Sequence, residues 1–254
     1  MGVPQYFPRG RNSTMLHIAN SQLAITARAS KVFQRHGDDF YAEPRSAAEA
    51  LFRVEAFGPR ILDPFCGTGR IVRAASRAGY SALGADIAPR WLDCPQHALF
   101  DDWRYSVADF AKPNQHNTLG GGGWQKPDAI VSNPPYRRDM LWEHLDKAIG
   151  MVAEKVAFLL PADFWHCRAA RDALNGRGLC RVYSIIPRPS MPPNICDEDA
   201  TTFIDADGDV RRIAGGAKDF VWAVFLKGYE GATSIHWLDT RIAAPAAPAL
   251  AEAA

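Results

Sequence analysis

The sequence lacks several features that would assign it to a particular class of protein. No apolar run among its 254 residues reaches the length of about 18 needed to cross a bilayer, and its N-terminus lacks the charged-then-apolar pattern of a secretory signal. We therefore expect a cytoplasmic protein with no membrane partner. The five cysteines include no Cys-x-x-Cys pair, so the sequence predicts neither a zinc site nor a disulfide framework.

The sequence also lacks a marked excess of charge of either sign. Its 29 lysines and arginines face 28 aspartates and glutamates, which leaves a net charge of +1. The overall charge is therefore not that of a typical nucleic-acid-binding protein. Arginine nevertheless supplies 22 of the 29 basic residues, and its guanidinium group suits bidentate contacts with phosphate and guanine. A local basic surface is compatible with this composition.

The apolar share of 47% and the charged share of 22% are typical of globular proteins. A chain of 254 residues can bury one substantial α/β core, with little left for a second large domain. Residues 1–37 read as a leader with one helix, and the alanine- and proline-rich residues 241–254 as a disordered tail. The domain itself is therefore predicted to span residues 38–240.

A glycine turn stands near the start of this domain. The stretch Asp63–Gly69 reads DPFCGTG; it follows the apolar pair Ile61-Leu62 and precedes a predicted helix that starts at Arg70. This order predicts a strand, a turn and a helix. Glycines tolerate positive φ and allow close approach of a ligand, so the N–H groups of the turn can point at a polar or anionic group.

A second motif, Asn133–Tyr136, reads NPPY and follows the apolar run 129–132 of another predicted buried strand. Its two prolines can neither pair in a strand ladder nor enter a helix interior. They predict a rigid corner that presents the side chain of Asn133 and the ring of Tyr136. In open α/β sheets, ligands bind at this carboxyl end of the strands.

Together these motifs resemble motif I and motif IV of the S-adenosylmethionine-dependent amino-methyltransferases, most closely the adenine-N6 DNA methyltransferases. The resemblance spans residues 40–226 and follows the gamma-class motif order. It implies an α/β fold with a doubly wound, Rossmann-like, seven-stranded sheet. The segments 181–187 and 220–226 would form the terminal antiparallel strand pair. It further implies S-adenosylmethionine as cofactor and no metal.

The resemblance also implies how the cofactor is held. Asp86, at the end of the predicted second strand, would accept the ribose hydroxyls. Phe40 and Tyr41 occupy the place of motif X, beside the methionine end, although Glu43 stands where relatives often have threonine; an ordinary capped turn is the alternative interpretation there. The predicted cofactor-binding residues are Phe40, Tyr41, Asp63, Pro64, Phe65, Cys66, Gly67, Thr68, Gly69, Asp86, Ile87, Asp109 and Phe110.

In related enzymes an acid–aromatic pair takes the adenine ring of the cofactor and its amino group. We assign this role to Asp109 with Phe110, and Asp102 with Trp103 is the competing pair.

The second motif supplies the predicted catalytic residues: Asn133, Pro134, Pro135 and Tyr136. The N6 lone pair of adenine is delocalised into the ring, so the amine is a poor nucleophile. The amide oxygen of Asn133 and the carbonyl of Pro134 could each accept one amino hydrogen. Tyr136 could stack on the base, a contact worth ~1–3 kcal/mol. Alignment and electrostatics would then dominate the catalysis.

A base buried in duplex DNA must be flipped out to reach such a corner, and the duplex must be held through its phosphates. The candidate phosphate contacts are Arg137, Arg138, Arg188, Arg211 and Arg212; solvated surface charge is the competing interpretation for each. No sizeable recognition domain follows the predicted core. Recognition would then reside in loops such as 112–127 and 188–219, or in a partner, or sequence preference would be weak. A homodimer is also compatible with the sequence, and a role in restriction-modification is one expectation.

Other functions share these motifs. RNA purine amino-methyltransferases and protein glutamine methyltransferases use a related (Asn/Asp)-Pro-Pro-Tyr corner, and guanine-N2 RNA enzymes commonly carry an aspartate where this chain has Asn133. A non-catalytic cofactor-binding partner subunit is a further alternative, although such relatives typically lose the asparagine or the glycines. A dehydrogenase is disfavoured because Gly67-Thr68-Gly69 is not followed by the third glycine of the dinucleotide motif.

Overall fold

The computed structural model describes most of the chain between Tyr41 and Arg241. The chain divides into two compact units, and of the described residues only those between Ile204 and Asp209 fall in the first. The predicted leader, Phe40 and residues 242–254 of the predicted tail lie outside the described residues. The described residues are 41–94, 96, 104–112, 126–165, 170, 174, 176–192, 195, 197–205, 207–213 and 215–241.

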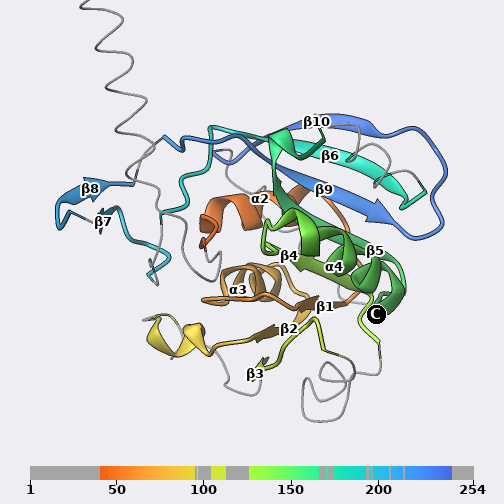
Figure 1. The fold of residues 1–254 in the computed structure, drawn as a ribbon, viewed down its shortest axis with the longest axis horizontal. Helices are drawn as coiled ribbons and strands as arrows, with labels where there is room; N and C mark the ends of the chain where they lie inside the picture. The colour runs from red at the N-terminus through yellow and green to blue at the C-terminus, as the bar shows by residue number, and fades with distance from the viewer. Residues whose placement is uncertain are drawn as a thin grey trace, which may run out of the picture. The chain divides into compact units, whose positions relative to one another are not determined.

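An eight-stranded sheet forms the centre of the second unit (Figure 1), in the order β10-β6-β9-β5-β4-β1-β2-β3. Strand β9 runs antiparallel to both of its neighbours, and the other pairs are parallel. The strands are β1 (Arg60–Asp63), β2 (Ser81–Asp86), β3 (Tyr105–Val107), β4 (Ala129–Ser132), β5 (Lys155–Pro161), β6 (Leu179–Ile186), β9 (Phe220–Leu226) and β10 (Ser234–Asp239).

This topology confirms the predicted doubly wound α/β fold, with β6 and β9 as the terminal antiparallel pair. The predicted number of seven strands is wrong, because β10 adds an eighth at the edge and pairs with β6 from Ser234↔Arg181 to Asp239↔Ile186. Only Leu238 of β10 is buried, whereas Ile235 and Trp237 are exposed. Ile235 and Trp237 alternate with polar residues in the sequence, but because both are exposed this alternation does not mark a buried face.

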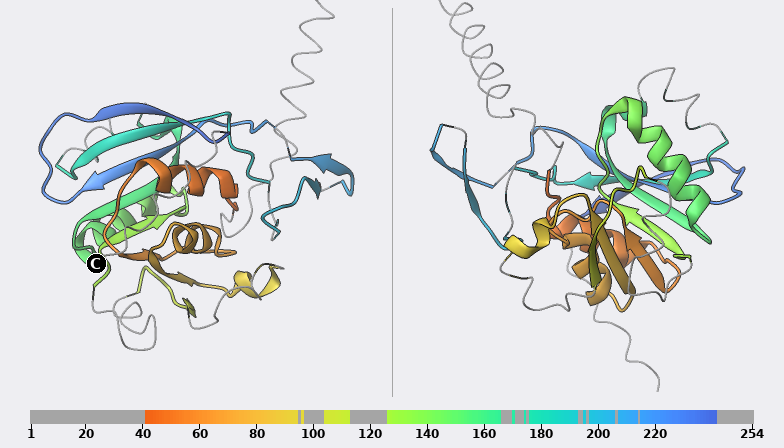
Figure 2. Two further views of the ribbon diagram at one scale, coloured as in Figure 1. Left: turned by 180° about the vertical axis from the view of Figure 1, so that it is seen from behind. Right: turned by 60° about the horizontal axis from the view of Figure 1, so that its bottom comes forward.

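Three helices of the described residues cover the sheet: α2 (Arg45–Val54), α3 (Arg70–Arg77) and α4 (Arg138–Met151). Helices α2 and α3 pack in one apolar cluster, which includes Val131, and α4 packs in another, which includes Ile130. Because consecutive strand residues point to opposite faces, these clusters lie on the two sides of the sheet, and Figure 2 shows α4 opposite the other two helices. Strands β5 and β9 are buried on both faces, which explains their near-continuous apolar sequences.

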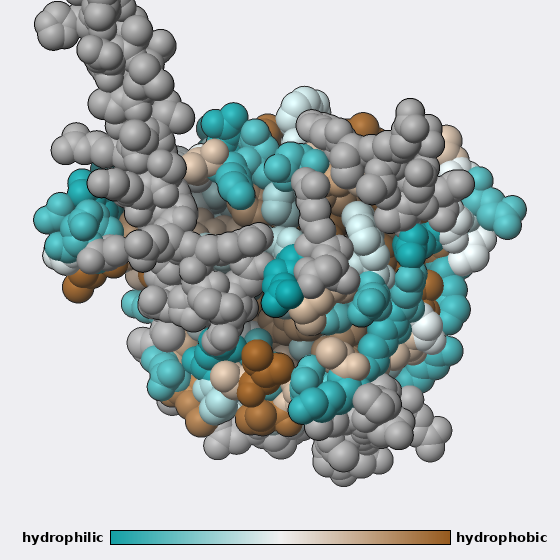
Figure 3. Space-filling view, viewed as in Figure 1, coloured by the Kyte–Doolittle hydropathy of each residue, from teal (hydrophilic) through white to brown (hydrophobic). Residues whose placement is uncertain are grey.

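Shorter elements complete the described chain. Two 3₁₀ turns, η1 (Arg90–Asp93) and η5 (Ala162–Trp165), follow β2 and β5. The connection between β6 and β9 contains a separate two-stranded sheet, β7 (Thr202–Ile204) with β8 (Val210–Arg212). Hydrophobic colour gathers over the β3 end of the large sheet in Figure 3. Ile87, just after β2, and Val107, in β3, are both exposed.

The buried carboxylate of Glu55, just after α2, joins that helix to the sheet. It accepts hydrogen bonds from Lys155 Nζ at 2.8 Å, from Arg181 Nε at 2.6 Å and from the Tyr183 hydroxyl at 2.8 Å. Burial alone would raise the pKa of Glu55, but the hydrogen bonds from Arg181, Lys155 and Tyr183 outweigh it and hold this pKa below its ordinary value. The ionised carboxylate is therefore a stabilising link between α2, β5 and β6.

We expect Glu55→Gln to lower the free energy of unfolding by about 3–5 kcal/mol at pH 7, because it leaves the buried Lys155 with only the exposed Glu154 as counter-charge. Since the pKa of Glu55 is lowered on folding, its contribution is complete above the unfolded pKa of about 4.3 and is lost as the pH falls through the folded value. Urea unfolding at pH 7 and below pH 4 measures both effects.

The matched control is Glu49→Gln, which removes partly exposed ion pairs with Arg45 and Arg77 and should cost less than about 1 kcal/mol. Equal free energies of unfolding for wild type and Glu55→Gln at pH 7 would contradict the stabilising role of the ionised Glu55. A difference between these two free energies that is as large below pH 4 as at pH 7 would also contradict it.

Candidate active site

A cavity of about 260 Å³ lies where β1, β2, β3 and β4 end. Segments that are far apart in the sequence supply its walls, from Tyr41 to His144. The predicted site residues among its lining are Tyr41, Phe65, Cys66, Gly67, Thr68, Asp86, Ile87, Asp109, Phe110, Asn133 and Pro135. Five other predicted residues are close in sequence but do not line it: Asp63, Pro64, Gly69, Pro134 and Tyr136. The competing pair Asp102 and Trp103 lies outside the described residues.

The glycine turn after β1 is tightly folded. The N–H of Cys66 donates to Ala85 O at 2.8 Å, and the N–H of Gly69 donates to Cys66 O at 2.6 Å. Gly69 has φ +82°, and a Cβ there would lie 2.6 Å from the Tyr105 hydroxyl oxygen. Only glycine fits this position without strain. The turn therefore closes against the ends of β2 and β3 and brings its backbone to the cavity.

Asp63 ends β1 and is 1% exposed. Its Oδ1 accepts the Ser132 hydroxyl at 2.6 Å and the N–H of Phe65 at 3.2 Å, so it joins the end of β1 to the end of β4. Burial raises the pKa of Asp63 well above its ordinary value; the Ser132 hydrogen bond lowers it, and the nearby carboxylates of Glu43 and Asp86 raise it further. In this structure Asp63 connects strands beneath the cavity.

Asp86 ends β2 and faces the cavity with both carboxylate oxygens already engaged. Oδ2 accepts the N–H of Gly67 at 2.9 Å, and Oδ1 accepts Ala88 N at 3.1 Å and Arg90 Nη1 at 2.6 Å. The N–H of Gly67, expected to point at a ligand, thus points at Asp86. A carboxylate has about four lone-pair sites and three are used here, so Asp86 can still accept one hydroxyl group of a ligand.

Asn133 projects from the corner after β4 toward the 41–43 segment. Its Nδ2 donates to Tyr41 O at 2.7 Å and to Glu43 Oε2 at 3.1 Å, while its Oδ1 accepts the hydroxyl of Tyr136. The ring of Tyr136 packs against Phe220, with centroids 5.9 Å apart. Every hydrogen-bonding atom of the Asn133 amide is therefore engaged, and the amide is held in one orientation.

An aromatic wall closes another side of the cavity. The ring centroids of Phe65 and Phe110 lie 5.1 Å apart, and the ring of His144 lies 4.8 Å from Phe65. Burial lowers the pKa of His144. The charges of Glu143 and Asp109 raise this pKa and that of Lys147 lowers it, and the net shift is downward, so the imidazole is neutral at pH 7. Its Nδ1 is buried and has no hydrogen-bond partner among the described residues.

Six lining residues were missed by sequence reasoning: Ala42, Glu43, Arg90, Ala111, Met140 and His144. Two of them had a usable signal. Met140 and His144 lie four residues apart on α4, directly after the NPPY corner, so they share one helix face. Arg90 pairs with Asp86 only because the chain turns back between them, and no local pattern marks this.

Glu43 and Asp86 line the cavity, and Asp63 lies beneath it. Glu43, Asp63 and Asp86 are all buried. Burial raises the pKa of the Cys66 thiol well above its ordinary value, and the charges of these three carboxylates raise it further. Burial likewise raises the pKa of Glu43, against the opposing charge of Arg70. Such a surface favours a ligand that carries positive charge.

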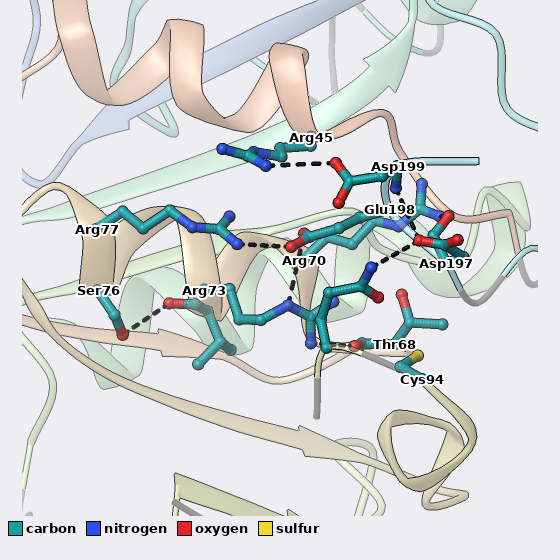
Figure 4. Close-up of polar contacts among 12 residues, drawn as sticks. Arg45, Thr68, Arg70, Arg73, Ser76, Arg77, Cys94, Asp197, Glu198 and Asp199 are labelled. Carbon is teal, nitrogen blue, oxygen red and sulfur yellow. Dashed lines mark hydrogen bonds and ion pairs between the residues drawn. The ribbon is translucent and has the colours of Figure 1, made fainter. Parts of the chain in front are cut away.

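Two buried arginines of α3 hold part of the 188–219 connection against the glycine turn (Figure 4). Arg70 donates to the backbone carbonyls of Glu43 at 2.8 Å, Ile195 at 3.0 Å and Asp197 at 2.9 Å. Arg73 donates to Thr68 O at 2.7 Å and lies 3.5 Å from Glu198, which also pairs with Arg77 at 2.6 Å. Residues 195 and 197–199 are thus anchored beside the cavity, and we call them the anchored segment.

The predicted phosphate contacts are dispersed. Arg137 is exposed next to the NPPY corner, and nothing is described of the side chain of Arg138. Arg188 is exposed and pairs with Asp219 at 2.6 Å. Arg211 and Arg212 are exposed on β8. Most of the 112–127 loop lies outside the described residues.

The described residues contain no group of three or more histidine, cysteine, aspartate or glutamate side chains placed to hold a metal ion. Among the helices that the structure describes, none has both the length and the apolar character needed to cross a membrane.

No protein-family model matches the chain. It is 39% identical to the tRNA (guanine(10)-N2)-dimethyltransferase of Methanothermobacter thermautotrophicus, over an alignment that covers 47% of this chain and 38% of that enzyme. The methyltransferase subunit of a type I restriction-modification system from Streptococcus thermophilus matches with a TM-score of 0.51 and 11% identity, covering 78% of this chain and 47% of that one. A putative RNA methyltransferase from Pyrococcus horikoshii matches with a TM-score of 0.48 and 14% identity, covering 83% and 98%.

The likeness to the restriction-modification subunit shows the fold alone. The chain has the Rossmann-like fold of the class I methyltransferases. It spans well under half the length of the tRNA methyltransferase that it matches in sequence.

We expect Asp63→Asn to keep the fold, because an amide oxygen can replace the one carboxylate oxygen that accepts Ser132 and Phe65. Asp63→Ala should cost about 1–3 kcal/mol, since it leaves the buried Ser132 hydroxyl without its acceptor.

The raised pKa of Asp63 means that the wild type loses stability as the pH rises from its unfolded pKa of about 3.9 through the folded value. The free energy of unfolding of Asp63→Asn, relative to that of the wild type, should therefore be higher at pH 8 than at pH 5.

Urea unfolding of the wild type and both variants at these two pH values is the measurement. A constant difference between wild type and Asp63→Asn at both pH values would show that Asp63 is ionised throughout, contrary to this expectation.

Proposed function

We propose that this protein transfers a methyl group from S-adenosylmethionine to the exocyclic amino group of a purine base in nucleic acid, and that the acceptor is the N6 amino group of adenine in DNA. The observation that carries the proposal is the position of Asn133. Its side-chain amide borders the same cavity as the glycine turn, Asp86 and the Asp109–Phe110 pair. An amine acceptor and a nucleoside-containing cofactor can therefore meet there.

The charge and the lining of the cavity support this cofactor. S-adenosylmethionine supplies a methyl group bound to a positively charged sulfur. The carboxylates of Asp86 and Asp109, which line the cavity, favour such a cation. Asp86 retains one lone-pair site for a ribose hydroxyl, and the Phe65–Phe110–His144 wall offers apolar surface for the adenine ring. The unpartnered Nδ1 of His144 is a further polar atom that a nitrogen heterocycle could satisfy.

The second motif supplies the acceptor chemistry. An amide oxygen has two lone pairs, so Asn133 Oδ1 can accept an amino hydrogen besides the hydroxyl of Tyr136. The carbonyl of Pro134 would accept the other hydrogen. Two acceptors placed in this way favour a pyramidal nitrogen, whose lone pair is then free to attack. The amine loses its proton to water after the methyl group has been transferred, so this chain needs no strong base.

The nucleic acid must present the base outside the helix. Flipping an adenine out of a duplex costs a few kcal/mol, and phosphate contacts must compensate for that cost. We assign these contacts to Arg137, Arg138, Arg188, Arg211 and Arg212. Base recognition would come from the connection that contains β7 and β8, or from a partner subunit.

A second acceptor is favoured by one specific observation. The relative with 39% identity is named for methylation of a guanine N2 in tRNA, so a guanine amino group in RNA is the alternative substrate. The neutral side chain of Asn133 favours adenine. Guanine presents a ring N–H beside its amino group, and a carboxylate would accept both donors better than an amide whose own N–H groups are directed elsewhere.

The decisive experiment measures transfer of tritiated methyl from S-adenosylmethionine to duplex DNA, single-stranded DNA and bulk RNA. We expect label in DNA that digests to N6-methylated deoxyadenosine. Asn133→Ala should lower the rate by about 100-fold or more, because it removes an acceptor that acts on the reacting amine. Calorimetric binding of S-adenosylmethionine by this variant, at near wild-type affinity, is the control for folding.

Label confined to RNA and recovered as N2-methylguanosine would show that the acceptor is the guanine amino group in RNA and not the adenine N6 amine in DNA. An Asn133→Ala variant as active as the wild type would refute the assigned role of this residue. Failure of the wild type to bind S-adenosylmethionine would overturn the proposal as a whole.

A further inference from the structure

Glu43 is the one buried acid of the cavity that the proposed reaction leaves without a role. It is 7% exposed, lines the cavity and lies directly before Pro44 and helix α2. Its Oε2 lies 3.1 Å from Asn133 Nδ2. Burying a carboxylate is costly, so a carboxylate kept at this place calls for a specific interaction. Its contact is with the side chain that would hold the reacting amine.

The 41–43 segment takes both hydrogens of the Asn133 amide. One goes to the carbonyl of Tyr41 at 2.7 Å and the other to the carboxylate of Glu43. An asparagine amide has two donors on nitrogen and two lone pairs on oxygen, so this arrangement fixes which end faces which way. A flipped amide would place its oxygen against two acceptors. Its oxygen therefore faces Tyr136, on the side of the NPPY corner.

We propose that Glu43 is a positioning residue that holds the Asn133 amide in the one orientation in which its oxygen can accept a hydrogen from the acceptor amine. This inference rests on the proposed function, and it assigns to Glu43 no contact with the reacting atoms. The carbonyl of Tyr41 fixes one amide hydrogen through the backbone, and Glu43 fixes the second through its side chain.

The support for Glu43 extends to the anchored segment. Arg70 donates to the backbone carbonyl of Glu43 and to the carbonyls of Ile195 and Asp197, all within 3.0 Å. The charge of Arg70 also favours the ionised form of Glu43. The orientation of Asn133 is thus held by a continuous set of buried contacts that starts in the connection between β6 and β9. In this arrangement Arg70 fixes the backbone from which Glu43 projects.

The test compares Glu43→Ala, Glu43→Gln and the matched control Glu49→Gln, a glutamate on α2 that pairs with Arg45 away from the cavity. With saturating DNA and cofactor, we expect Glu43→Ala to lower kcat about 10- to 100-fold, while the Kd for S-adenosylmethionine changes less than about threefold. Glu43→Gln keeps an acceptor oxygen and should restore kcat to within about fivefold of wild type. Glu49→Gln should match the wild type.

A second readout does not depend on activity. The side-chain amide of Asn133 can be assigned by NMR as the ¹⁵N signal that is lost in Asn133→Ala. We expect both of its protons to exchange slowly with solvent in the wild type and in Glu43→Gln. In Glu43→Ala one proton should exchange at least about tenfold faster, because it has lost its acceptor.

These readouts separate the two proposals. A wild type that transfers no methyl group but shows the protected amide, with faster exchange in Glu43→Ala, would refute the proposed function and uphold the role of Glu43. An active wild type with unchanged kcat and unchanged exchange in Glu43→Ala would overturn the inference. Equal losses in Glu43→Ala and Glu43→Gln, accompanied by weaker cofactor binding, would also overturn it, because the carboxylate would then serve the cofactor.

Discussion

The hydrogen bond from the Ser132 hydroxyl to the carboxylate of Asp63 joins the ends of two neighbouring parallel strands, and the geometry of the site depends on it. Strands β1 and β4 pair in register from Ile61↔Ala129 to Leu62↔Ile130. The two motifs that follow them are therefore adjacent in space although they are distant in sequence. Because this contact is buried in a medium of low dielectric, it is stronger than the same contact in water. It fixes the relative positions of the glycine turn and the NPPY corner before any ligand binds.

Further polar contacts fix the positions of other segments around the cavity. Asp86 receives the N–H of Gly67, which ties the turn to the end of β2, and Arg70 ties the same region to the anchored segment. Lys147 on α4 donates to the carbonyl of Phe110 and, at 2.9 Å, to that of Lys112. Networks whose members are satisfied rigidify a site, whereas unpaired buried groups would destabilise it. The proposed reaction needs such rigidity, because its catalysis would come from alignment of two reactants rather than from a strong base.

The sequence predicted those parts of the structure that have a local signature. Strands β1, β4, β5 and β9 are apolar because both of their faces are covered, and the turn at Gly67 and Gly69 is marked by residues that tolerate positive φ. The edge strand β10 has one buried side chain and no such mark. The roles of Glu43, Arg70 and His144 arise only from tertiary contacts. A buried arginine that binds three backbone carbonyls resembles any surface arginine in sequence, so the anchoring of residues 195 and 197–199 could not be predicted from the length of their connection.

Glu43 and Asn133 also constrain one another. An aspartate in place of Asn133 would set two carboxylates about as close as the present 3.1 Å contact, and like charges at that distance cannot both ionise. With Glu43 buried beside it, the acceptor at position 133 is best kept neutral. A neutral amide oxygen can hold an amino hydrogen without removing the proton. The amine becomes acidic only once it carries the methyl group, so methyl transfer would precede loss of the proton. The pairing of the Glu43 acid with the Asn133 amide beside the cavity would favour this order.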